Sequence, residues 1–298
     1  MTKTKKIIIT LLAVVLTFMT AACSSDLQDL YSFVSGDDYI SKIEDGATLV
    51  EDIDVGQGDS YLISNSGFGN ILIDTGDTEH KDILVSHLKK RGIKKIDYVI
   101  LTHPHSDHIG GMTGVLDNFQ VENIYMPKMT HNTATFKKMI NKVKEKNLYF
   151  KEAKSGVKIS LGKGSSINFL SPTKDMSLKD LDNSDAVCML KKNGRKVLFT
   201  GDIFKETEIK LIPRIGRIDI LKVAHHGSHK ATCKELLMAS KPTYAMIGVG
   251  EDNKYDHPSK SALNRLDKYN VKVYRTDLSG NIGFTINNDG SIKVNTSR

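Results

Sequence analysis

The stretch Thr102-His103-Pro104-His105-Ser106-Asp107-His108-Ile109-Gly110-Gly111 decides which fold this sequence predicts. It holds three histidines and one aspartate within residues 103–108. They follow the apolar run 96–101, a pattern typical of a buried strand that ends in a loop. Imidazole and carboxylate groups hold divalent transition metals while leaving coordination positions open. Only 10 of the 298 residues are histidine, so this cluster favours a metal site over a polar surface loop.

The spacing within this stretch predicts two neighbouring metal positions. His103 and His105 are two residues apart, which places both rings on one side of an extended turn. Asp107 and His108 begin the next turn, where they can point at a second position. We therefore expect one or two divalent ions at this loop.

The rest of the chain alternates strands with helices. Strands are expected at 48–55, 61–64, 70–76, 96–101, 124–126, 157–159, 166–170, 186–191, 196–200, 218–224, 244–248, 271–274, 282–286 and 292–294. Helices are expected at 77–91, 111–119, 135–146, 205–213, 234–240 and 259–268. Two β-rich halves with interleaved helices predict an α/β (α+β) fold, a four-layer αββα sandwich over residues 46–298.

The pattern His-x-His-x-Asp-His after an apolar strand resembles the signature of the metallo-β-lactamase fold hydrolases. In that family an aspartate placed like Asp74 is buried and orients the histidine loop. Asp202, after Thr200-Gly201, resembles the aspartate that bridges two metals. The motif 222–228 resembles the one that supplies the last histidine; we favour His225, which comes first off the strand, and His226 stays open. The implied metal ligands are His103, His105, Asp107, His108, Asp202, and His225 or His226.

One position departs from the family pattern. The sequence has no histidine between His131 and His225, where most members have one more ligand. The stretch that matches this position is 182–186. The first metal position then lacks its third imidazole, and water or Asn183 is expected to complete it. A more oxygen-rich site makes Mn²⁺ more competitive with Zn²⁺.

This departure narrows the resemblance to one branch of the family. The motifs 54–60 and 256–259, together with Asn183 and the His-His-Gly-Ser motif, resemble the hydrolase domain of ComEC-type DNA-uptake proteins. The resemblance covers residues 46–298. Gly56 and Gly58 could bring backbone N–H groups near an anionic substrate. The expected substrate-binding residues are Gly56, Gln57, Gly58, Asp59 and Ser228.

The resemblance implies metal-assisted hydrolysis of a phosphodiester, with extracellular DNA as the favoured substrate. A divalent cation can lower the pKa of water from about 15.7 to about 7. Asp202 would bridge two ions, Asp107 would orient the hydroxide, and His257 would bind phosphate or protonate the leaving group. His226 and Asn183 are expected in supporting positions. The alternatives are a phosphorylcholine or teichoic-acid phosphodiesterase, a β-lactamase or lactonase, and a non-catalytic nucleic-acid-binding protein.

The first 23 residues predict a targeting segment. Three lysines precede the apolar run 7–19, and small residues lead to Cys23. This resembles a bacterial lipoprotein signal, which implies a lipid on Cys23 and attachment to the outer face of the cell membrane. Ordinary cleavage near Ala22 and an uncleaved anchor are the alternatives. Residues 24–45 are expected to form a tether.

Composition adds two weaker statements. Without residues 1–23 the chain has 39 basic and 35 acidic residues, a net charge of +4, which mildly favours an anionic substrate. Beyond Cys23 only Cys188 and Cys233 remain, too few for a disulfide framework. No protein partner is predicted.

Overall fold

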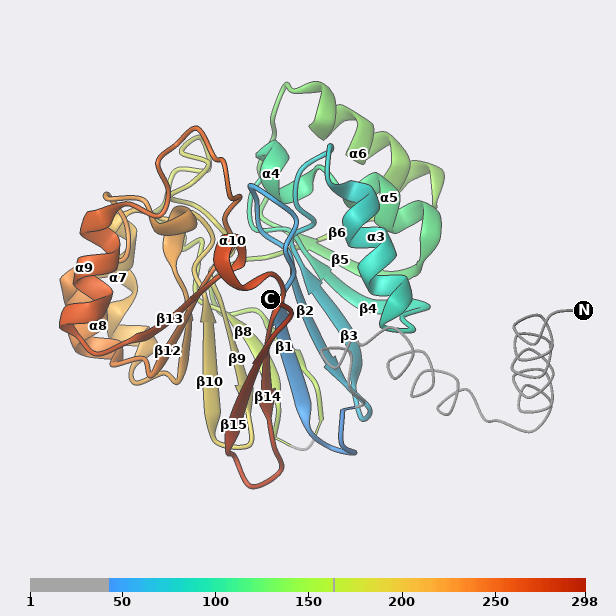
Figure 1. Ribbon diagram of the computed structural model, residues 1–298. Coiled ribbons are helices and arrows are strands. Elements are labelled where there is room, and N and C mark those ends of the chain that lie inside the picture. The colour runs from blue at the N-terminus through green and yellow to red at the C-terminus, as the bar shows by residue number, and fades with distance from the viewer. Residues whose placement is uncertain (1–42, 163) are drawn as a thin grey trace, which may run out of the picture. The chain divides into compact units, whose positions relative to one another are not determined.

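Two β-sheets lie face to face at the centre of the part of the chain that the computed structural model describes, residues 43–162 and 164–298 (Figure 1). The predicted signal segment 1–23, its Cys23 and most of the tether 24–45 lie outside the described residues. No helix within the described ranges is both long enough and apolar enough to cross a bilayer.

The first sheet has eight strands. In spatial order they are β15 (Ile292–Thr296), β14 (Ile282–Ile286), β1 (Thr48–Asp52), β2 (Tyr61–Asn65), β3 (Gly69–Ile73), β4 (Lys95–Ile100), β5 (Gln120–Met126) and β6 (Phe150–Glu152). The pairs from β3 to β6 are parallel, and the other pairs are antiparallel.

The second sheet has seven strands. In spatial order they are β13 (Lys272–Arg275), β12 (Tyr244–Ile247), β11 (Ile220–Lys222), β10 (Arg195–Phe199), β9 (Cys188–Lys192), β8 (Ser166–Phe169) and β7 (Lys158–Ser160). Here β10 to β13 pair in parallel, and β7 to β10 pair antiparallel. Each sheet therefore contains one parallel run of four strands.

Helices supply the crossovers that parallel strands require. These crossovers contain α3 (Lys81–Lys90), α4 (Ser106–Ile109), α5 (Met112–Asn118), α6 (Ala134–Glu145), α7 (Lys205–Ile215), the 3-10 turn η2 (Ala224–Gly227), α8 (Lys234–Ser240) and α9 (Lys260–Lys268). The short helix α10 (Thr276–Ser279) instead joins β13 to β14 of the other sheet. Helices α3, α5 and α6 cover the outer face of the first sheet, and α7, α8 and α9 cover that of the second (Figure 1).

Alternation along the strands separates three buried apolar layers. In β2, Leu62 packs under the helices while Ile63 packs between the sheets. In β10, Leu198 packs under the other helices and Phe199 packs between the sheets. Neighbouring side chains on a strand point to opposite faces, so both faces of each sheet are covered. This arrangement confirms the predicted four-layer αββα sandwich.

Some boundaries differ from the prediction. Helix α3 begins at Lys81 rather than at residue 77, because the Asp77 carboxylate accepts a hydrogen bond from the His80 backbone N–H (2.8 Å) and forms a turn. Helix α7 continues past Pro213 to Ile215. The short elements β6 and α10 were not predicted, since three or four residues carry no readable period.

Candidate metal centre

The candidate metal centre lies where the parallel strands of both sheets end. Asp74 follows β3, His103 and His105 follow β4, Asp202 follows β10, and His226 follows β11. In open α/β sheets the carboxyl ends of the strands form the usual ligand-binding edge. The loops are tied together by backbone hydrogen bonds, such as that from the Asp59 N–H to the Asp107 carbonyl (3.1 Å).

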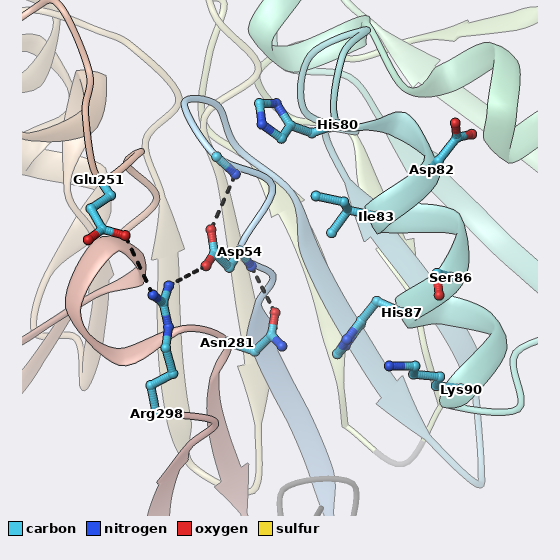
Figure 2. Close-up of a pocket in the computed structure, with 11 residues that line it drawn as sticks. Asp54, His80, Asp82, Ile83, Ser86, His87, Lys90, Glu251, Asn281 and Arg298 are labelled. Carbon is cyan, nitrogen blue, oxygen red and sulfur yellow. Dashed lines mark hydrogen bonds and ion pairs between the residues drawn. The ribbon is translucent and has the colours of Figure 1, made fainter.

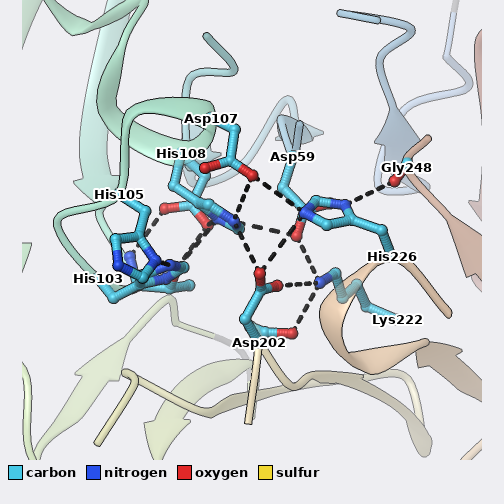
Figure 3. Close-up of polar contacts among 12 residues, drawn as sticks. Asp59, His103, His105, Asp107, His108, Asp202, Lys222, His226 and Gly248 are labelled. Carbon is cyan, nitrogen blue, oxygen red and sulfur yellow. Dashed lines mark hydrogen bonds and ion pairs between the residues drawn. The ribbon is translucent and has the colours of Figure 1, made fainter. Parts of the chain in front are cut away.

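Four side-chain atoms enclose one point in this centre (Figure 3). His226 Nε2 lies 3.3 Å from Asp107 Oδ2 and 3.5 Å from Asp202 Oδ2. His108 Nε2 lies 3.3 Å from Asp202 Oδ2 and 3.7 Å from Asp107 Oδ2. Four ligands about 2.0–2.1 Å from a tetrahedral ion are roughly 3.4 Å apart. The spacing of these atoms therefore matches a divalent-metal cage before any ion is bound.

Both imidazoles direct their Nε2 atoms into this cage. His226 Nδ1 lies 2.8 Å from the Gly248 carbonyl oxygen, and a carbonyl only accepts, so Nδ1 carries the hydrogen. His108 Nδ1 lies 2.9 Å from Asp74 Oδ2 in the same way. Each Nε2 atom is buried and makes no hydrogen bond. Buried polar atoms without partners are rare in folded proteins, and a metal ion is the partner that fits these two.

The electrostatics also fit a cation. Burial lowers the pKa of His226, but Asp202 and Asp59 outweigh burial and raise this pKa to about 10. Burial likewise opposes charge on His108, yet Asp202 and Asp107 raise its pKa well above the usual value. The carboxylates thus leave an excess of negative charge. A divalent cation would supply the missing positive charge and leave both rings neutral.

Asp59 lies in the same buried cluster, but its carboxylate faces His226 Nδ1 and Lys222 instead of the cage. Asp59, His108, Asp202 and His226 form a buried cluster that could hold a metal ion. However, Asp59 Oδ1 lies 3.3 Å from His226 Nδ1, the nitrogen that points away from the cage. Asp59 Oδ2 lies 2.5 Å from Lys222 Nζ. Asp107 therefore completes the cage, and Asp59 supports His226 from behind.

Lys222 is a functional residue that the sequence analysis missed. It is 1% exposed at the end of β11. Its Nζ donates to the Gly201 carbonyl oxygen (2.7 Å) and to Asp202 Oδ1 (3.3 Å). The ammonium group thereby holds one oxygen of Asp202 and leaves Oδ2 for the cage. A single lysine inside an otherwise apolar strand was the signal that could have identified it.

Asp74 lies in the place that the prediction gives it, behind the histidine loop. Its side chain is fully buried. Asp74 Oδ1 accepts the Thr102 N–H (2.8 Å), and Oδ2 accepts the Thr102 hydroxyl (2.7 Å) as well as facing His108. These contacts fix the start of the loop and the ring of His108 together.

A second group of possible ligands lies beside the cage. His103 Nε2 is 2.9 Å from His105 Nδ1, and Asp182 Oδ1 is 3.1 Å from His105 Nδ1 and 3.8 Å from His103 Nε2. Of the two groups expected to complete this position, water or Asn183, the Asn183 side chain faces away from it. Asn183 Oδ1 instead accepts hydrogen bonds from the Phe204 N–H (3.2 Å) and the Thr207 hydroxyl (3.1 Å), on the side of α7.

The preference for His225 over His226 is also corrected. His225 Nε2 lies 3.8 Å from Asp202 Oδ2, its side chain is 26% exposed, and its ring lies 5.0 Å from that of Phe204. His226 is 2% exposed and reaches the cage. Both residues have positive φ, 50° and 51°, so the backbone turns sharply and the second ring points inward.

A cavity of about 270 Å³ opens beside the two groups. It is lined by Gln57, His105, Ser106, Asp107, His131, Thr133, Asp182, Asp202, His225, His226, Tyr255 and His257. The ring of His257 lies 5.9 Å from that of His225. Burial and the neighbouring His226 lower the pKa of His257.

Of the predicted substrate-binding residues, Gln57 lines this cavity. Asp59 and Ser228 do not line it, because both are buried. Asp59 packs against Lys222, and the backbone N–H of Ser228 donates a hydrogen bond to the His225 carbonyl oxygen. A Cβ on Gly58 would lie 2.5 Å from the Asp107 carbonyl oxygen, so this glycine is needed for close packing of two loops.

Gly56 lies on the other side of its loop, in a larger hollow of about 700 Å³ beside α3 (Figure 2). Arg298 lines one side of this hollow and contacts Asp54 Oδ2 (2.6 Å). A Cβ on Gly56 would meet the His80 ring at 2.7 Å. The hollow contains none of the possible metal-holding groups among the described residues, so Gly56 is not a residue of the metal cavity.

Comparison with known proteins shows a family match and several relatives. Residues 53–251 match the family described as the metallo-beta-lactamase superfamily. The chain is 32% identical to ComE operon protein 3 of Bacillus subtilis over 260 residues, which is 80% of this chain and 33% of that protein. It is 28% identical to competence protein ComA of Neisseria gonorrhoeae over 243 residues, 80% of this chain and 32% of the relative. The chain thus spans about a third of the length of these relatives.

The fold also matches a solved structure, that of the metallo-beta-lactamase fold protein YhfI from Bacillus subtilis. The TM-score is 0.51, and the match covers 77% of this chain and 97% of YhfI. Sequence identity is 13%, so this likeness concerns the fold alone.

Proposed function

Because the chain belongs to the metallo-beta-lactamase superfamily, we propose that it is a metal-dependent phosphodiesterase that cleaves extracellular DNA. The cage carries this proposal, because two carboxylate oxygens and two Nε2 atoms converge on one point beside a cavity. A divalent cation bound there would acidify a water molecule and polarise a phosphoryl oxygen.

The residues around the cavity divide the remaining tasks. Asp74 and the Gly248 carbonyl hold the two rings so that Nε2 faces the cage. Lys222 holds one oxygen of Asp202 and keeps the other in place. His257 lines the cavity, where it would bind a phosphate oxygen or protonate the leaving group.

A basic groove whose lining starts just after the loop 225–228 supports a polyanionic substrate. The basic groove, about 340 Å³, begins one residue after the His-His-Gly-Ser loop. Its charged side chains are Lys205, Lys230, Lys234, Arg265, Lys268 and one acid, Glu235. Glu235 faces Lys205 at 3.5 Å, so the net charge of the groove stays strongly positive. In this proposal a DNA strand bound in the cavity extends to the groove, where the lysines would contact its phosphates.

The location belongs to the proposal too. The lipid anchor predicted at Cys23 would place the cavity outside the cell, where DNA is an available substrate. The resemblance to the hydrolase domain of DNA-uptake proteins supports the same substrate, and the relatives include proteins named for competence.

The test is hydrolysis of single- and double-stranded DNA by the full chain. Chelator-treated protein should not cut DNA, and added Mn²⁺ or Zn²⁺ should restore cutting. The Asp202→Ala variant should stay inactive with either metal, because it loses a cage oxygen. Metal-dependent hydrolysis of a phosphorylcholine ester without DNA cleavage would indicate that the substrate is a phosphodiester of the cell wall and not DNA. If the chain hydrolyses neither DNA, nor the phosphorylcholine ester, nor bis-nitrophenyl phosphate, the phosphodiesterase proposal is wrong.

The basic groove makes a separate prediction about salt. Replacing Lys230, Lys234 and Lys268 by alanine should flatten the dependence of DNA affinity on salt. Each lost phosphate contact lowers the slope of log K against log salt by about 0.9 for duplex DNA. The measurement is DNA binding by fluorescence anisotropy across a salt series, with melting temperature as the check on folding.

A matched control changes three lysines elsewhere. Lys137, Lys138 and Lys144 are exposed on α6, outside the basic groove. Their replacement by alanine removes the same charge, so it should leave the slope close to that of the wild type. Equal slopes for both triple variants would show that the basic groove does not hold DNA.

A further inference from the structure

His103, His105 and Asp182 form a second convergent set of ligand atoms. His103 and His105 leave the end of β4, and Asp182 lies in the loop before β9. One ligand atom from each lies within 4.8 Å of the others. His103 is fully buried, and the Asp182 side chain is 20% exposed. The set therefore borders the cavity at one side of the cage.

We propose that Asp182 supplies the third protein ligand of a second metal position, where most members of the superfamily use a histidine. This inference rests on the metal-dependent function proposed above and assigns a ligand set to the same cavity. The chain then holds two ions, one in the cage and one in a site made of two imidazoles and a carboxylate.

The loop that carries Asp182 is fixed in a way that points this side chain inward. The next residue, Asn183, is anchored to α7 by its side-chain oxygen. Its Nδ2 donates to Asp180 Oδ2 (3.0 Å). With Asn183 directed toward α7, Asp182 is directed toward the histidines. Asp182 Oδ1 is buried there and faces both histidines, 3.1 Å from His105 Nδ1 and 3.8 Å from His103 Nε2, a spacing that two ligands of one ion would also have.

The histidines are oriented for the same purpose. His103 Nδ1 lies 3.3 Å from Asp185 Oδ2, which leaves His103 Nε2 facing His105 and Asp182. Asp185 Oδ2 also accepts the Asp202 N–H (2.6 Å). The buried Asp185 carboxylate thus positions both the ring of His103 in the second site and the backbone of Asp202 in the cage. Supporting carboxylates of this kind commonly accompany metal-binding histidines.

The ligand types give this site a preference. Two imidazoles and a carboxylate form a harder, more negative site than three imidazoles. Carboxylate-rich sites suit Mn²⁺, whereas nitrogen-rich sites suit Zn²⁺. The second position should therefore take Mn²⁺ more readily than a three-histidine site would.

The experiment counts metal ions per chain in the absence of substrate. Chelator-treated full chain is loaded with excess Mn²⁺, freed of unbound ions and analysed by elemental mass spectrometry. The wild type should retain two ions and Asp182→Ala one. Asp182→His should retain two and shift competition toward Zn²⁺. Asp175→Ala, an exposed carboxylate in the same loop, should retain two.

The Asp182→Leu variant, which is similar in size but offers no ligand atom, covers the case in which the alanine variant does not fold, and it should also lose an ion. Two ions in Asp182→Ala, or a single ion in the wild type, would overturn the inference. Because the count needs no substrate, a chain that binds two ions but leaves DNA intact would refute the proposed function and not this site.

Discussion

The His226→Ala variant is expected to hydrolyse DNA at least about 10³-fold more slowly than the wild type, the scale of removing a group that organises transition-state charge. His226 supplies one of the two Nε2 atoms of the cage. Its loss leaves Asp107, His108 and Asp202 without their fourth partner. The measurement is kcat/KM on a fluorescent DNA oligonucleotide at saturating Mn²⁺.

The neighbouring histidine is the control for this prediction. His225→Ala should lower kcat/KM by roughly tenfold or less, because His225 lines the cavity but lies 3.8 Å from Asp202 and outside the cage. Metal content separates the two variants further: His226→Ala should lose the cage ion, and His225→Ala should keep it. The reverse order of effects would restore His225 as the ligand.

Replacing Lys222 by methionine should lower the free energy of unfolding of the metal-free chain by about 3–5 kcal/mol, the usual result of removing one partner from a buried ion pair. Methionine keeps most of the side-chain volume but removes the charge that neutralises Asp59 and Asp202. Burial lowers the pKa of Lys222, but these two carboxylates raise it above its usual value, so the side chain is charged when folded. Urea unfolding with chelator present gives the free energy directly.

Lys191→Met is the matched control for this prediction. Lys191 lies exposed on β9, and a surface substitution there should change stability by no more than about 0.5 kcal/mol. Adding metal should narrow the gap between Lys222→Met and the wild type, since a cation in the cage restores positive charge beside Asp202. A loss no larger than that of Lys191→Met would show that Lys222 does not stabilise the carboxylates.

The sequence was sufficient to predict the layers of the fold and the loops of the site. Apolar runs followed at once by polar motifs mark strands that deliver side chains to one edge, as β4 does with His103 and β10 with Asp202. The choice of Asp74 as an orienting residue rested on a family resemblance, and the structure gives it the contact with His108 that such a role needs.

The remaining details depend on backbone direction, which spacing does not encode. Adjacent residues such as Asp182 and Asn183 point to opposite sides of a loop, and contacts with α7 decide which one faces the histidines. The same holds for His225 and His226, whose positive φ values reverse the order expected from an extended chain. Lys222 was overlooked because its partners come from loops distant in sequence.

The cage draws its four atoms from both sheets. Asp107 and His108 lie in α4, which follows β4 of the first sheet. Asp202 follows β10 and His226 lies in η2, which follows β11, both in the second sheet. An ion bound there would connect the two halves of the sandwich. Metal binding and the packing of one sheet on the other are therefore thermodynamically linked. At a free-ion concentration a hundredfold above the dissociation constant, the bound ion would raise the free energy of unfolding by about 2.7 kcal/mol. Metal starvation would thus weaken the architecture together with the chemistry.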